Sequence, residues 1–265
     1  MRQGAAATAR NSREMSSWVE SSSRNFTARH DEHEAAGVRS VLELLEDARE
    51  RLAAVFPALP AEVTVVVHSS RTQLDIAQPF LPVARLASSP VARRYLAGWT
   101  GGGTVHVLAP RLLAERAANT EGSREMLLLT PAALYVQLVV AECNPELAPP
   151  WTPRSTARCI RWAWLVAGAG QWFSGQTAYA RPAIARRLRE GARPQFPPRL
   201  RDAALLGGTV IDLIAREQGV ARVVDLLRSL PRGGPREALI ASFDGRALVH
   251  TEGTWRAHLS RLAGR

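Results

Sequence analysis

Leu127–Pro145 reads LLLTPAALYVQLVVAECNP, and this stretch predicts a helix that is buried on almost every side. Thr130-Pro131 is a favourable helix start, because Thr caps helices and proline needs no backbone donor at the first helical position. Asn144-Pro145 is an equally clear stop. Between them, Ala132–Ala141 is apolar except for Gln137. We therefore expect a central helix packed inside the protein.

A second helical stretch, Arg161–Gln176, reads RWAWLVAGAGQWFSGQ. Its small residues Ala163, Ala167, Gly170 and Ser174 recur at i, i+4, i+7 and i+11, so they share one face of a helix. Small side chains let another helix approach closely. We expect this face to pack directly against a neighbouring helix.

In order and spacing, the two stretches resemble the metal-binding helices of gluzincin metallopeptidases, in the peptidase MA-like superfamily. The family places H-E-x-x-H on the first helix, where two His bind zinc and the Glu is the general base. It places a third ligand, Glu, in a W-L-x-E-G-x-A-like context on the second helix, and Trp164–Ser174 (WLVAGAGQWFS) is similar to that context. Arg201–Glu217 and Trp255–Leu262 resemble the family's supporting and last helices, so the resemblance covers most of residues 18–263.

The resemblance also identifies what this chain lacks. The positions that correspond to the metal site and to the acid after it are held by Ala133, Leu134, Gln137, Ala167 and Gln171. No His occurs between His106 and His250, and no Asp, Glu or His occurs in residues 161–179. Zinc needs carboxylate, thiolate or imidazole ligands. We therefore predict no catalytic residue, no metal and no cofactor, and a former site that is filled by direct helix packing.

Periodicity along the chain predicts an α+β fold: a small N-terminal mixed sheet with helices, followed by a mainly helical C-terminal lobe, in a zincin-like arrangement. We expect one domain over 18–265, with a strand-containing lobe at 18–120 and a helical lobe at 121–265. In the first lobe we expect strands or hairpins within 18–30, 62–68 and 95–110, helices at 38–52, 71–78 and 111–118, and a proline-punctuated loop after residue 78. In the second lobe we expect helices at 131–142, 161–173, 180–190, 201–217, 220–230, 236–243 and 254–263.

Composition sets the broad class of protein. At 265 residues and 46% hydrophobic, the chain is long enough to bury a sizeable core. We expect no membrane span, because the longest apolar stretch is interrupted by polar residues and proline. Residues 1–17 have no apolar segment, so we expect no secretory signal there, and their Ala, Ser and Arg content predicts a disordered lead-in. Two cysteines make no disulfide framework, and we therefore expect reduced thiols and a cytoplasmic location.

The net charge of +10 comes from arginine alone, because the chain contains no lysine. Such usage, with abundant Ala, Gly and Pro, is typical of GC-rich coding and is not in itself a sign of phosphate binding. The charge is nevertheless uneven, with ten arginines against one acid in residues 153–201. A polyanion-binding patch is therefore an alternative, and its candidate residues are Arg154, Arg158, Arg161, Arg181, Arg186, Arg187, Arg189 and Arg193.

Other polar groups have structural interpretations. In residues 30–34 (HDEHE), Asp31 and Glu34 fit a capping box better than a metal site. His68 and His106 lie on strands that can be neighbours, where a structural role is favoured over metal binding. Gly101–Gly103 is expected to turn a hairpin, because a strand follows it and not a Gly-Lys-Ser/Thr helix start.

The leading hypothesis is a catalytically inactive metallopeptidase-like protein with a binding, scaffolding or regulatory role, whose partner is a protein or a peptide. A nucleic-acid or polyanion binder that uses the Arg154–Arg201 region is the first alternative. An enzyme with a relocated, unrecognised site is the second.

Overall fold

The computed structural model describes residues 18–149, 153–190 and 193–264, so the predicted lead-in at 1–17 lies outside the described residues. Within this part the chain forms one five-stranded sheet in the order β1-β2-β3-β5-β4. The strands are β1 Trp18–Ser22, β2 Phe26–Asp31, β3 Val63–His68, β4 Gly98–Gly101 and β5 Thr104–Leu108. The central three are parallel, and β1 and β4 pair antiparallel at the two edges. This sheet, followed by a mainly helical part, confirms the α+β prediction.

The hairpin turns and the first helix follow the sequence signals. Gly102 and Gly103, between β4 and β5, both have positive φ, the conformation that a two-residue hairpin turn requires. Asp31 accepts a hydrogen bond from the backbone N–H of His33 and so caps the turn before α1, as predicted. The carboxylate of Glu34, expected to complete a capping box, accepts a hydrogen bond from Arg111 at 3.2 Å.

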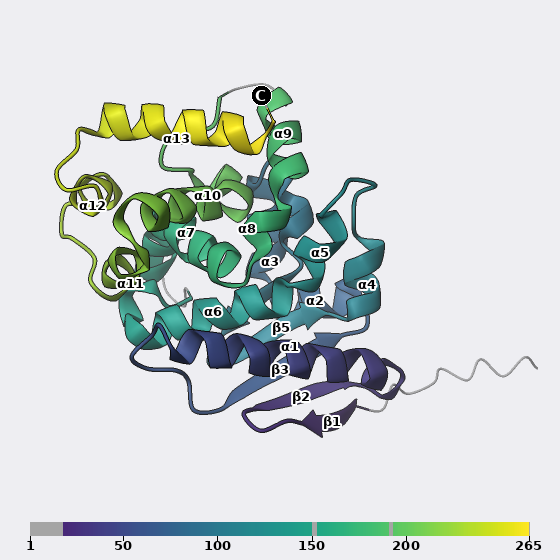
Figure 1. The fold of residues 1–265 in the computed structure, drawn as a ribbon. Helices are drawn as coiled ribbons and strands as arrows, with labels where there is room; N and C mark the ends of the chain where they lie inside the picture. Colours follow the sequence, from purple (N-terminus) through teal and green to yellow (C-terminus); the bar gives the residue numbers. More distant parts are fainter. Residues whose placement is uncertain (1–17, 150–152, 191–192, 265) are drawn as a thin grey trace, which may run out of the picture.

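One face of the sheet is covered by helices. Val63, Val65 and Val67 alternate along β3 and are buried, as period-2 geometry requires of a covered face. α1 (Ala35–Ala53) and α6 (Thr130–Cys143) contact each other and cover this face, as Figure 1 shows. The β4 edge of the sheet therefore lies against the central buried helix.

The helical part is built around α7, which packs against both α6 and α10. The other helices of the first part are α2 Arg71–Ala77, α3 Phe80–Ala87, α4 Pro110–Glu115 and α5 Ser123–Leu128. The helices after α6 are α7 Pro153–Phe173, α8 Gln176–Tyr179, α9 Arg181–Arg189, α10 Leu200–Gln218, α11 Val220–Arg228, α12 Pro235–Ser242 and α13 Leu248–Leu262. Short 3-10 turns occur at η1 Glu32–Glu34, η2 Ala92–Tyr95 and η3 Pro145–Leu147. Buried apolar residues of the sheet and of these helices form one cluster.

Two local predictions are wrong. The expected loop after residue 78 contains α3, which tolerates Pro82 because the residue lies in the first helical turn, where backbone N–H groups have no intrahelical partner. Thr130 is not the cap of α6, since α5 runs into α6 through Leu129 and Thr130 is already helical. Its hydroxyl is consequently left inside the protein.

No helix in the described part of the chain is both long enough and apolar enough to cross a membrane.

Candidate functional site

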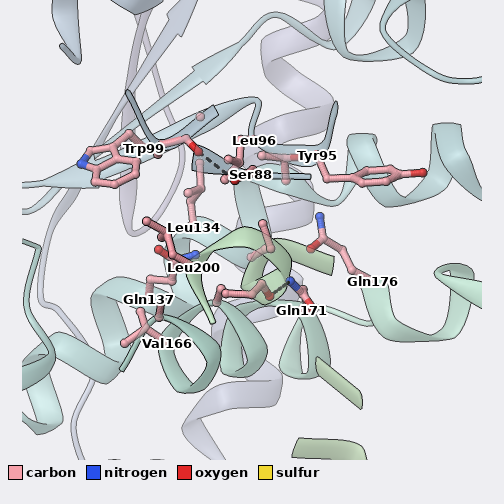
Figure 2. A pocket seen from close by; sticks show the side chains of 18 of the residues that line it. Ser88, Tyr95, Leu96, Trp99, Leu134, Gln137, Val166, Gln171, Gln176 and Leu200 are labelled. Atoms are coloured by element: carbon pink, nitrogen blue, oxygen red, sulfur yellow. Dashed lines mark hydrogen bonds between the residues drawn. The ribbon is translucent and has the colours of Figure 1, made fainter. Parts of the chain in front are cut away.

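A cavity of about 130 Å³ lies between the β4 edge of the sheet and the helices α6, α7 and α10. In Figure 2 one wall is formed by Ser88, Tyr95, Leu96 and Trp99, and the opposite wall is formed by residues of α6 and α7. Most of the labelled side chains are partly exposed, so the cavity opens to the surface. A cavity of this volume can hold a small apolar group.

The five positions that the sequence analysis assigned to a former metal site all line this cavity. They are Ala133, Leu134 and Gln137 on α6, and Ala167 and Gln171 on α7. The helical spacing of each set places its members on one face, and the packing of α6 on α7 turns the two faces toward each other.

The prediction that small residues fill the site is only partly correct. Gly170 does allow close packing, because a Cβ added there would lie 2.8 Å from the carbonyl oxygen of Ala133. Ala163 and Ala167 instead line the cavity. Their methyl groups are too short to span the distance to the sheet edge, so this part of the site remains open.

Two polar residues of the cavity, Gln171 and Thr130, differ in their hydrogen bonding. Gln171 is held rigidly, since its Nε2 donates to the carbonyl of Ala203 at 3.1 Å and its Oε1 accepts from the N–H of Gly208 at 2.8 Å. Thr130 is 4% exposed, and its hydroxyl oxygen has no hydrogen-bond partner among the described residues. A buried hydroxyl without a partner carries a desolvation cost that a ligand can relieve.

The described lining contains no Asp, Glu, His or Arg side chain. Cys159 is its only strong nucleophile, and burial raises the pKa of this thiol, which disfavours the reactive thiolate. Amides and methyl groups do not match the ligands that zinc takes in proteins. The arrangement therefore supports binding of an apolar group and does not support acid–base or metal chemistry at this place.

The predicted arginine patch is divided by the fold. Arg187 is 2% exposed and makes two hydrogen bonds, of 2.6 and 2.8 Å, to the carboxylate of Asp202, so this residue does not belong to the surface patch. Arg186 on α9 pairs with Glu190, the residue that follows the helix, and Arg181 and Arg189 on α9 are exposed. The remaining four candidates, Arg154, Arg158, Arg161 and Arg193, line two adjacent hollows beside α7.

His68 and His106 are neighbours, as the strand pattern predicted. His68 Nε2 and His106 Nδ1 are 3.1 Å apart, and the rings stack with centroids 5.4 Å apart. Among the described residues, no group of three or more His, Cys, Asp or Glu side chains is placed to hold a metal ion. The pair is consistent with one imidazole donating to the other.

Sequence reasoning missed the part of the site contributed by α3, η2 and β4. Ala84 and Ser88 line the cavity but lie in the segment predicted as a loop, and Tyr95, at the start of the predicted hairpin, ends the short turn η2. Glycine at position 98 was a readable signal, because a Cβ there would lie 2.5 Å from Leu134 on α6. Comparison with protein-family models, with curated proteins and with solved structures gives no match to this chain.

Proposed function

We propose that this chain is a non-catalytic binding protein on a metallopeptidase-like scaffold, and that its cavity receives an apolar side chain of a protein or peptide partner. The observation that carries the proposal is the cavity itself. It lies where the resemblance implies a metal site, and its described lining contains no Asp, Glu or His side chain. A cytoplasmic location, expected from the unpaired cysteines, is part of the same proposal.

The surface beside the cavity favours a protein partner over a small polar metabolite. Phe80, Val83 and Leu86 on α3 are 43%, 62% and 83% exposed. Ala84 follows Phe80 by about one helical turn and Ser88 follows it by about two, and both of these residues line the cavity. The only charged residue between positions 76 and 90 is Arg85, which is buried. Uncharged apolar surface of this kind marks a contact site.

Thr130 adds one polar requirement. Its unpartnered hydroxyl can donate to a carbonyl oxygen or accept from an N–H, and a peptide backbone offers both. An apolar side chain with its adjoining peptide group can therefore fill the cavity and form a hydrogen bond with Thr130, which a hydrocarbon cannot do.

The test uses N-acetyl-leucine methylamide as probe and methyl resonances of Ala133 and Ala167 as readout. Burial of a leucine side chain is worth about 1.5–3 kcal/mol, so we expect at least roughly tenfold weaker binding of N-acetyl-aspartate methylamide. Ala167→Phe fills the cavity and should abolish the shift of the Ala133 methyl, the readout group that this variant retains. Ala257→Phe, at an exposed position of α13, is the control and should leave both methyl shifts unchanged.

Metal analysis of the purified protein completes the test. Stoichiometric zinc together with a peptidase activity that is lost on substitution of Gln137 would overturn the proposal. Equal binding of both probes, or leucine binding that survives Ala167→Phe, would show that the cavity is not the binding site.

A further inference from the structure

A second hollow, on a neighbouring face of α7, is lined by arginine. This groove has a volume of about 800 Å³ and lies between the first half of α7, the segment 193–201, and the helices α12 and α13. Its arginines are Arg161, Arg193, Arg199, Arg201, Arg236 and Arg256. The acid among its described lining residues is Glu252, which is already paired with Arg256.

The other five arginines of the groove are not neutralised. All five are exposed, and none of their side chains makes an ion pair or a hydrogen bond with the described residues. Elsewhere in the structure arginines are often paired, as Arg29 is with Glu20 and Arg246 with Glu217. Like charges that are gathered without counter-charges repel one another, and a bound anion removes that repulsion.

The positive surface continues past the groove. Arg161 also lines an adjoining hollow of about 300 Å³, together with Arg154, Arg158 and Arg232. Arg154, Arg158 and Arg161 occur at i, i+4 and i+7, so they follow one another along a single face of α7. The described lining of this adjoining hollow also contains one acid, Glu146. Arg161 joins the two hollows, and arginines outnumber acids in both, which fits a ligand with regularly repeated negative charges.

The walls of the groove are apolar and aromatic. Trp164 is 1% exposed, and its indole N–H has no acceptor among the described residues. Phe196 is half-buried, with its ring centroid 5.1 Å from that of Trp255. A partly exposed ring such as that of Phe196, with arginines in the same groove, suits an unpaired base, whereas reading a duplex requires an element that projects into a DNA groove.

We propose that this arginine-lined groove binds single-stranded nucleic acid, with arginines on the phosphates and a base against the ring of Phe196. This inference is independent of the apolar cavity, because the two hollows face neighbouring sides of α7. Ile160, Arg161 and Trp164 face the groove, whereas Ala163 and Ala167 face the cavity.

The experiment measures binding of a fluorescent twelve-nucleotide oligouridine to the full chain by anisotropy. With about five phosphate contacts, a single strand gives a salt slope near −3.5, so binding should weaken roughly 100-fold between 50 and 200 mM salt. Arg161→Glu with Arg236→Glu should weaken binding at least roughly tenfold and flatten the slope. Arg181→Glu with Arg189→Glu changes the net charge equally on α9, outside the groove, and should weaken binding less than about threefold.

Three results would overturn the proposal. Equal losses in the two double variants would show that binding depends only on net charge. Absence of oligouridine binding at 50 mM salt would show that the chain does not bind single-stranded nucleic acid. Tighter binding of a twelve-residue polyglutamate, or of a duplex of equal length, would assign the groove to another kind of anion. Circular dichroism of both variants separates loss of binding from loss of fold.

Discussion

His68 makes the stability of the folded chain sensitive to acid. Burial, and secondarily the charge of His106, lower the pKa of His68 from 6.5 to about 4. Because the folded pKa lies below the unfolded one, the unfolded state takes up a proton first as pH falls. The stabilisation is complete above pH 6.5 and is lost progressively between pH 6.5 and 4, by about 3 kcal/mol.

Chemical denaturation at pH 7 and pH 4.5 checks this prediction. His68→Gln keeps a hydrogen-bonding group beside His106 but removes the titration, so its free energy of unfolding should change less between the two pH values. His250→Gln is the control, because His250 is exposed on α13. An acid sensitivity that is the same in His68→Gln as in the unaltered chain would contradict the assignment.

At the scale of elements, close approach of α7 and α10 sets the position of both hollows. A Cβ added at Gly168 would lie 2.6 Å from the backbone of Gly207, and one added at Gly207 would lie 2.5 Å from the carbonyl oxygen of Trp164. The two helices are therefore in backbone contact, which only glycine permits. We expect Gly168→Ala to lower the free energy of unfolding by about 1–3 kcal/mol, because the helices must separate.

The matched control is Gly253→Ala on α13, where an added Cβ meets nothing within 4 Å. Alanine has the higher helix propensity, so this variant should gain up to about 1 kcal/mol. Replacement of glycine by alanine should thus change the free energy of unfolding in opposite directions at the two sites. Urea denaturation measures both changes. A gain in stability for Gly168→Ala would show that α7 and α10 do not touch there.

The sequence predicts the helices and strands better than it predicts the cavity and the groove that lie between them. Apolar periodicity identified α1, α6 and β3, because burial acts on every residue of such a segment. The glycine pair of the β4–β5 hairpin was equally readable. α3 escaped prediction, since Pro79 and Pro82 suggested a loop and three of its apolar residues, Phe80, Val83 and Leu86, face solvent.

The candidate site shows the same limit. Five cavity positions followed from the resemblance of two helices, but the cavity exists because Ala163 and Ala167 do not reach the β4 edge. Likewise, Arg187 and Arg189 are two residues apart, yet one is buried against Asp202 and the other is exposed. Tertiary packing determines whether such an arginine is buried or exposed. A count of charges along the sequence carries no information about that packing.

For the whole molecule, the net charge of +10 lowers the stability of the fold by an amount that depends on where the arginines lie. Five unneutralised arginines in one groove repel one another more strongly than the same number scattered over the surface. A folded chain that retains such a cluster is less stable than it need be, as is common for residues kept for binding. Charge reversal within the groove should therefore stabilise the fold, and charge reversal outside it should have a smaller effect.

The melting temperature measures this directly. Relief of about 0.5–1 kcal/mol of repulsion corresponds to roughly 1–4 °C for a chain of this size. At 0.1 M salt, Arg161→Glu with Arg236→Glu should melt higher than Arg181→Glu with Arg189→Glu, although both lower the net charge equally. At 1 M salt the screening length falls from about 10 Å to about 3 Å, and the difference between the variants should disappear. If the two variants melt together at 0.1 M salt, the arginines of the groove do not form a repulsive cluster, and the argument for an anionic ligand loses its energetic basis.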